Sequence, residues 1–289
     1  MSIHVEPVTP ALLRGHQPPS PAGNKGSRGH VVVVGGSRTT PGALLLAGVA
    51  ALRVGAGVLA LAAPDSVAIT LAVAVPEASV TGFADDLRAQ DSGRLDPVRE
   101  VTRSADAVLI GPGLDDPEQT RILLAGLVEA VNGPVVLDAF ALGVLPRLDR
   151  GTALLSGGGV LTPNSSEAAR LLEVEPDALD DDAATVAHSI AQRWKVTVTY
   201  GGVIVDPAGE AYSTGAGHAG LGTSGSGDVL AGCVVGLLGR GVDPLWAAVW
   251  ATYLHGAAGD RLAARVGQLG FLARELLDQI PLVLTELQA

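Results

Sequence analysis

The chain has little cysteine, few aromatic side chains and no excess of basic charge. Its 289 residues include one cysteine, Cys233, so an internal disulfide is excluded, and its apolar neighbours indicate a thiol in the core. Aromatic residues make up 3% of the chain, and the formal net charge is −11. Phosphate contacts need clustered lysine and arginine, so a nucleic-acid surface is not expected. The lone thiol favours a cytoplasmic location.

The sequence also lacks a long hydrophobic segment. Its N-terminus carries polar residues and prolines rather than a charged start followed by an apolar run, so we expect no signal peptide. The apolar stretch 43–52 is too short to span a bilayer, and Gly48 interrupts it. We therefore expect no membrane association.

Several common site motifs are missing as well. The chain contains no Walker-type G-x-x-x-x-G-K-[S/T] loop and no G-x-S-x-G elbow. Residues 215–220 match G-x-G-x-x-G, but no βαβ unit surrounds them, so a Rossmann site is rejected. His30, His188, His218 and His255 lack the spacing of metal ligands, and we expect surface or capping roles for them.

The chain does contain a large fraction of apolar residues, arranged in alternating predicted strands and helices. Hydrophobic residues make up 47% and charged residues 17%, which favours a single α/β domain over 1–289 with a leading segment, 1–24. Residues 31–34 form a wholly apolar run, typical of a strand buried on both faces. Pro41 opens a predicted helix to about Val54, and a second strand is expected at 58–62.

The alternation continues as an open parallel sheet with an antiparallel edge. Further strands are expected at 107–110, 135–138 and 160–161, followed by turns at 111–113, Asp138 and 162–164 that should converge on one crevice. The antiparallel edge is expected at 196–200, 203–205 and 211–213, and two helices at about 227–238 and 244–264. Trp246 and Trp250, four residues apart, are interpreted as packing residues.

The glycine-rich segment 222–232 carries the strongest chemical signal. Glycines 222, 225 and 227 can bring backbone N–H groups close to a ligand, and the first turn of the following helix directs unpaired N–H donors to the same place. Such a helix start binds phosphate readily. Asp228 follows directly, so it can accept a proton from a hydroxyl that attacks a phosphoryl group held there.

Together the motifs resemble the ADP- or ATP-dependent NAD(P)H-hydrate dehydratases, a branch of the ribokinase-like superfamily. The resemblance runs from Lys25 to about Ala264. Its pieces are 25–31, 35–37, 44–57, 110–114, 137–139, 161–163, 222–232 and 253–256. It implies a ribokinase-like three-layer α/β/α sandwich with a mostly parallel central sheet and an antiparallel edge.

The resemblance also implies an activity. A nucleotide phosphorylates the hydroxyl of hydrated NADH or NADPH, and loss of phosphate restores the cofactor, with ADP or ATP as co-substrate and Mg²⁺. It implies a homo-oligomer, a tetramer in the family. No protein ligand for the metal is identified. Asp228 would be the catalytic base and a substrate contact.

The resemblance assigns binding roles to further positions. The substrate-binding residues that it implies are Ala43, Gly113, Asn164 and Asp228. The nucleotide-binding residues that it implies are Thr199, Tyr200, Gly201, Gly202, Val203, Gly225, Ser226 and Gly227.

The sequence departs from the family pattern at three places. Phe140 stands where the family has a second aspartate, Asn164 where it has histidine, and 199–203 lacks the usual lysine and threonine. Loss of a lysine near phosphates removes a cation, and asparagine does not titrate as histidine does. Three hypotheses stay open: an active hydrate dehydratase, a ribokinase-like kinase of a small hydroxylated metabolite, and a nucleotide-binding paralogue without activity.

Overall fold

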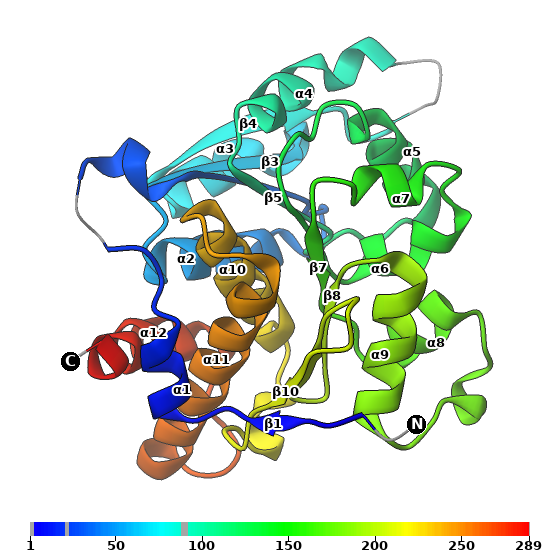
Figure 1. Cartoon of the computed structure of the whole chain (residues 1–289). Coiled ribbons are helices and arrows are strands. Elements are labelled where there is room, and N and C mark those ends of the chain that lie inside the picture. The colour runs from blue at the N-terminus through cyan, green and yellow to red at the C-terminus, as the bar shows by residue number, and fades with distance from the viewer. Residues whose placement is uncertain (1–2, 21–22, 88–91, 289) are drawn as a thin grey trace.

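The computed structural model describes residues 3–20, 23–87 and 92–288, and it contains one ten-stranded sheet with helices on both faces (Figure 1). The strands are β1 (Glu6–Pro7), β2 (His30–Val34), β3 (Val58–Pro64), β4 (Ala78–Phe83), β5 (Ala107–Ile110), β6 (Val135–Leu137), β7 (Gly159–Leu161), β8 (Thr197–Tyr200), β9 (Val203–Val205) and β10 (Ala211–Ser213). The described helices are α1 (Pro10–Gly15), α2 (Pro41–Arg53), α3 (Asp65–Ala74), α4 (Asp96–Arg103), α5 (Pro117–Leu127), α6 (Phe140–Val144), α7 (Gly151–Leu154), α8 (Ser165–Leu172), α9 (Ala183–Trp194), α10 (Ser226–Gly239), α11 (Pro244–Val266) and α12 (Ala273–Gln288).

The strand order places a topological switch point in the middle of the sheet. The order is β1-β10-β9-β8-β7-β6-β5-β2-β3-β4. The seven strands that run from β8 to β4 in this order are all parallel to their neighbours. β9 is antiparallel to both β8 and β10, and β1 pairs with β10 in parallel. The expected mostly parallel sheet with an antiparallel edge is confirmed. Connections leave β2 and β5 in opposite directions, so a crevice opens between their carboxyl ends.

Alternation along the buried strands builds two cores. In β2, Val31 and Val33 face one core, and Val32 and Val34 face the other, and all four are fully buried. Helices α2, α10, α11 and α12 cover the first face, and α5, α6, α8 and α9 cover the second, on opposite sides of the sheet in Figure 1. A strand buried on both faces needs continuous apolar sequence, which is why these runs were recognisable.

Glycines allow α2 and α10 to pack closely. A β-carbon on Gly232 would stand 2.2 Å from the carbonyl oxygen of Ala47, and one on Gly236 would stand 2.6 Å from that of Ala51. The two helices therefore run in register with their backbones near contact. One face of the apolar stretch 44–52 is covered inside the subunit by α10 and α12, whereas Leu45, Leu46, Val49 and Leu52 are only partly buried.

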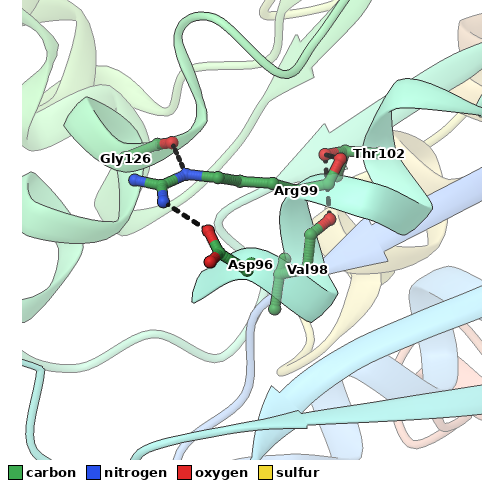
Figure 2. Close-up of polar contacts among 5 residues, drawn as sticks. All are labelled: Asp96, Val98, Arg99, Thr102 and Gly126. Atoms are coloured by element: carbon green, nitrogen blue, oxygen red, sulfur yellow. Dashed lines mark hydrogen bonds and ion pairs between the residues drawn. The ribbon is translucent and has the colours of Figure 1, made fainter. Parts of the chain in front are cut away.

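Figure 2 shows how α4 is held to its neighbour α5. The Nε of Arg99 donates to the carbonyl oxygen of Gly126 at 2.8 Å, and its Nη1 pairs with Asp96 at 2.9 Å. Thr102, fully buried, donates its hydroxyl to the carbonyl oxygen of Val98 at 2.9 Å. Arg99 thus satisfies the end of α5 and positions α4 over the second core.

The leading segment is more structured than the sequence indicated. β1 pairs with β10, and α1 packs near α12. The ring of His16 stacks on Trp246 with centroids 3.6 Å apart, and its carbonyl oxygen accepts the indole N–H of Trp250 at 2.7 Å. The expected packing role of both tryptophans is confirmed. None of the helices in the described ranges is long and apolar enough to cross a membrane.

Candidate active site

The turns after β2, β5, β6 and β7 converge at the carboxyl edge of the sheet, as expected. The N–H of Gly36 donates to the carbonyl oxygen of Pro112 at 2.7 Å, and the hydroxyl of Thr162 donates to Asp138 at 2.7 Å. Gly111 has φ +132°, and a β-carbon there would lie 1.8 Å from the carbonyl oxygen of Asp138. The turns are therefore packed backbone against backbone into one rim.

The start of α10 faces this rim. Gly225, its N-cap, has φ 88°, and a β-carbon on it would lie 2.6 Å from Leu46, so both conformation and packing require glycine. A β-carbon on Gly227 would meet no atom within 4 Å. Gly222 has φ −71°, an ordinary value. Of these three glycines, Gly225 adopts the left-handed conformation that other residues avoid. Gly227 instead leaves open space beside the first turn of α10, through which a ligand can reach the backbone.

Asp228 lies half-buried in that first turn. Burial, followed by the nearby charges of Asp138 and Glu167, raises the pKa of Asp228 to about 7. An aspartate with a pKa near neutrality can accept a proton and hold it, which an ordinary exposed aspartate does poorly. Gly232 of α10 faces Ala47 of α2, and Gly236 faces Ala51. One helical turn toward the N-termini, the same pairing places Asp228 level with Ala43.

Asp138 and Glu167 complete a group of three mutually repelling carboxyls. Burial raises the pKa of Asp138 to about 6, opposed by the hydrogen bond from Thr162. Burial also raises the pKa of Glu167 to about 7, with the charge of Asp138 adding to the rise. The charges of Asp138 and Glu167 thus favour the protonated form of Asp228. A ligand that carries a cation, or a hydroxyl that can give up its proton, suits this group of carboxyls.

One face of α11 ties together the two segments expected to bind nucleotide. The hydroxyls of Thr199 and Thr252 lie 2.9 Å apart, and the hydroxyl of Ser226 lies 2.8 Å from Nε2 of His255. Thr252 and His255 are three residues apart on the helix and therefore share a face. Burial lowers the pKa of His255 to about 4, so the imidazole is neutral at pH 7. The expected surface or capping role is wrong for His255, because this histidine is buried and bonded to Ser226 in the first turn of α10.

The predicted nucleotide residues 199–203 form the hairpin between β8 and β9. Gly201 and Gly202 have φ 58° and 80°, as a tight two-residue turn requires. The side chain of Thr199 is buried in its bond to Thr252, so this side chain supports the hairpin from inside and does not face a ligand. The hydroxyl of Tyr200 donates to that of Ser165 at 3.3 Å, which brings the hairpin to the start of α8.

The predicted substrate residues fall on two sides of Asp228. A β-carbon on Gly113 would lie 3.1 Å from that of Ala43, so these two are direct neighbours. Asn164 is the N-cap of α8: its side-chain oxygen accepts from the N–H of Glu167 at 3.0 Å, and its own N–H donates to Glu167 at 2.9 Å. The side chain of Asn164 also bonds the carboxylate of Glu167 and helps to lower its pKa, so Asn164 and Glu167 act as one hydrogen-bonded pair at the start of α8.

Two cavities flank these side chains. One of about 480 Å³ lies beyond Gly36 and Leu114 and is bordered by Arg38, Asp115 and Asp116. Another of about 300 Å³ lies between α6 and α8 and is bordered by Glu167. Both volumes lie in the range of small-ligand sites. Within the described part of the chain, neither cavity is bordered by Asp228 or by the predicted substrate and nucleotide residues, so each lies beside the candidate site rather than at it.

No group of three or more His, Cys, Asp or Glu side chains among the described residues is arranged to hold a metal ion. Mg²⁺ in phosphoryl-transfer sites is commonly held by substrate phosphates with few protein ligands. The crowded carboxyls fit a cation that arrives with a nucleotide, and they do not form a cage of their own.

Three site residues escaped the sequence prediction. Glu167 carried a detectable signal, because asparagine followed three residues later by glutamate is a capping-box pattern. Asp138 stood at a strand end, and it was predicted as part of the rim without a chemical role. His255 had no recognisable signal, since only the packing of α11 brings it to Ser226.

Comparison with known proteins identifies the family. The family model described as NAD(P)H-hydrate dehydratase matches residues 31–282. The chain is 40% identical over 286 residues to an ADP-dependent (S)-NAD(P)H-hydrate dehydratase of Xanthomonas campestris, covering 98% of this chain and 97% of that protein. It spans about half the length of the bifunctional NAD(P)H-hydrate repair enzymes that it also matches.

Solved structures agree. An ADP/ATP-dependent NAD(P)H-hydrate dehydratase from Bacillus subtilis, co-crystallised with ATP and Mg²⁺, superposes with a TM-score of 0.82 at 28% identity, covering 99% of this chain and 100% of that one. A ribokinase-like superfamily protein from Enterococcus faecalis superposes with a TM-score of 0.81 at 23% identity, covering 99% of this chain and 97% of that one, and shows the fold. With the ribokinase-like architecture and the Asp228 site in place, the chain belongs to the NAD(P)H-hydrate dehydratase family.

Proposed function

We propose that this protein catalyses the ADP- or ATP-dependent dehydration of hydrated NADH and NADPH. The observation that carries the proposal is the position of Asp228, an acid with a pKa of about 7 in the first turn of α10 and next to the open backbone at Gly227. The family assignment supports the choice of substrate.

The reaction has two balanced steps. Asp228 accepts the proton of the substrate hydroxyl, and the hydroxyl oxygen attacks the terminal phosphorus of the nucleotide, so that one P–O bond forms while the bond to the leaving nucleotide breaks. In the second step the ring nitrogen donates electrons, the C–O bond to phosphate breaks, and the neighbouring carbon loses a proton. Phosphate departs far more readily than hydroxide, and the dihydronicotinamide is restored.

The side chains around Asp228 have distinct roles in this scheme. The backbone N–H groups of Gly225 and Gly227 hold the transferring phosphoryl group, since that of Ser226 donates to the carbonyl oxygen of Thr223, and the neutral His255 fixes the hydroxyl of Ser226 beside it. The hairpin 199–203 holds the rest of the nucleotide. Ala43 and Gly113 form one wall of the hydrate site, and Asn164, paired with Glu167 at the start of α8, forms the other.

Mg²⁺ and self-association complete the proposal. Mg²⁺ would neutralise charge on the transferring phosphoryl group and would be held mainly by the phosphates. The protein would act as a single cytoplasmic domain in a homo-oligomer. Two apolar side chains on α3, Ile69 and Val73, are 80% and 78% exposed and support an interface there.

A single assay tests the function. The protein is incubated with hydrated NADH, Mg²⁺ and either ADP or ATP, and the absorbance of the restored dihydronicotinamide is followed. We expect recovery with at least one nucleotide. Asp228→Asn, the matched control, should lose roughly 10²–10⁴-fold in rate and keep nucleotide affinity within a few-fold. No recovery by the wild type, or full recovery by the variant, would contradict the proposal.

A further inference from the structure

The cavity of about 300 Å³ between α6 and α8 has a composition unlike the rest of this acidic chain. Its wall includes Phe140, Arg147, Arg170 and Glu167, together with small residues of α6. The chain has three phenylalanines and a net charge of −11, so an aromatic ring with two arginines around one hollow is a notable concentration. The combination of a π-face and guanidinium groups suits a ligand that carries both a flat ring and phosphate.

Phe140 is not packed into either of the two cores. Its side chain is 39% exposed, whereas Phe271 is fully buried and Phe83 nearly so. The preceding residue, Ala139, has φ 51° and ψ −126°, a region that favours glycine. A strained backbone is retained where the position of the next side chain matters. Here it separates Asp138, which is turned into the buried bond with Thr162, from Phe140 at the cavity wall.

The two arginines are available for a ligand. In the described ranges neither Arg147 nor Arg170 makes a hydrogen bond or an ion pair, and both are exposed. A β-carbon on Gly143 would lie 3.7 Å from Nη1 of Arg170, so this guanidinium lies over α6 beside the cavity. Other surface arginines, such as Arg53 and Arg261, are paired with acids.

The cavity adjoins the reaction centre. Glu167 borders it and also acts on Asp228 through its charge, and Ala139 directly follows Asp138. A ligand that extends from Asp228 past Asn164 therefore reaches this hollow. The larger cavity on the opposite side places Asp85, Asp115 and Asp116 against one arginine, Arg38, and so disfavours phosphate.

We propose that this cavity binds the distal adenosine-phosphate half of the dinucleotide substrate, with the base stacked on Phe140 and phosphate oxygens bound by Arg147 and Arg170. The proposal rests on the proposed function, because it assumes that the molecule at Asp228 is a dinucleotide. A cavity of about 300 Å³ is at the small end of ligand sites and suits part of a dinucleotide rather than the whole.

The test compares a whole substrate with a truncated one. KM and kcat are measured for hydrated NADH and for hydrated reduced nicotinamide mononucleotide, which lacks the adenosine monophosphate half. The variants are Phe140→Ala and the double variant R147Q/R170Q. The control is R53Q/R261Q, which removes the same charge from surface ion pairs away from the cavity. Melting temperatures verify that each variant folds.

We expect each cavity variant to raise KM for hydrated NADH by about tenfold with kcat near that of the wild type, since stacking and guanidinium–phosphate contacts contribute to binding. KM for ADP, and KM for the truncated substrate, should stay within twofold. The control should match the wild type. An unchanged KM for hydrated NADH, or an equal rise for both substrates, would overturn the subsite.

Direct binding separates this proposal from the proposed function. The dissociation constant of NADH, the product, is measured by calorimetry for the same proteins, and it needs no turnover. If the wild type restores no NADH but the cavity variants bind NADH about tenfold more weakly, the subsite stands and the proposed reaction fails. If the variants bind NADH like the wild type, the subsite is refuted, whatever the turnover.

Discussion

Asp228 illustrates how a single residue can favour function over stability. Burial and two neighbouring acids raise its pKa to about 7, which suits a proton acceptor working near neutral pH. The same causes make its charged form costly in the folded protein. A proton-accepting carboxylate of the kind proposed here is expected to lower the free energy of unfolding at the pH where it is ionised.

Asp228→Asn should therefore stabilise the protein while it abolishes turnover. The folded-state pKa lies above the value of 3.8 for an unperturbed aspartate, so the folded state binds the proton more tightly, and stability falls as pH rises from about 4 to 7. We expect the variant to gain about 1 kcal/mol at pH 8, after allowing for the lost interaction of the charge with the helix start, and less at pH 5. Thermal melts at the two pH values measure this. A variant less stable than the wild type at pH 8 would contradict it.

Glu167→Gln should move the pH dependence of turnover. Its charge helps to raise the pKa of Asp228, so its removal should lower that pKa and shift the acid limb of kcat/KM to lower pH. Because the pKa of Glu167 is itself about 7, its charge is present at pH 7 and above, and at pH 7 the variant should keep a larger fraction of its own maximal kcat/KM than the wild type does. Glutamine can still accept the bond from Asn164, so α8 keeps its cap. If the acid limb of the kcat/KM profile lies at the same pH in the variant and the wild type, Glu167 does not act on Asp228.

At the scale of elements, the glycine-rich turn and α10 separate folding from binding. Gly225 is required by its φ of 88° and by Leu46, whereas a β-carbon on Gly227 would project into open space. Adjacent glycines in one motif thus serve different purposes. One permits the turn, and the other leaves the backbone accessible.

Paired alanine substitutions should separate these purposes. Gly227→Ala should leave the melting temperature unchanged or slightly raised, because alanine favours helix by up to about 1 kcal/mol, and should weaken ADP binding about tenfold by occupying the approach to the backbone. Gly225→Ala should lower stability by about 1–3 kcal/mol through strain and the clash with Leu46. Melting curves and ADP titrations measure both. Equal ADP affinity for Gly227→Ala and the wild type would exclude a ligand from that space.

The sequence predicted those elements whose local pattern matches their surroundings. The run at 31–34 and the helix from Pro41 were recognisable, because a strand buried on both faces and a proline-opened helix leave unambiguous signatures. β1 is two residues long and depends on β10, so its short sequence carries no such signature. Asp228 was found through the flanking glycines, while His255 depends on α11 crossing Ser226, a contact that only tertiary packing creates.

At the scale of the whole molecule, one surface feature is unexplained by the subunit alone. Ile69 and Val73 project from one face of α3 and are 80% and 78% exposed. Two large apolar side chains four residues apart on an outer helix are typical of an interface. The apolar helix α2, in contrast, packs one face against α10 and α12, and its other apolar side chains are partly buried.

A double glutamate variant tests α3 as an interface. I69E/V73E should reduce the mass in solution to that of one subunit, because burying two carboxylates against a second apolar face is costly. Light scattering after size-exclusion chromatography measures the mass. The control, Thr70→Glu, adds a charge on the same helix at an exposed position outside the pair and should keep the wild-type mass. An oligomer that persists in I69E/V73E would place the interface elsewhere.

Helix α11 holds the β8–β9 hairpin through Thr252 and the first turn of α10 through His255. Because one helix is bonded to both segments, they cannot separate without breaking a hydrogen bond inside the core. We therefore expect the proposed nucleotide site to keep its shape when nucleotide binds and leaves. Amide protons of the hairpin and of the opening turn of α10 should accordingly exchange with deuterium together, as one cooperative unit.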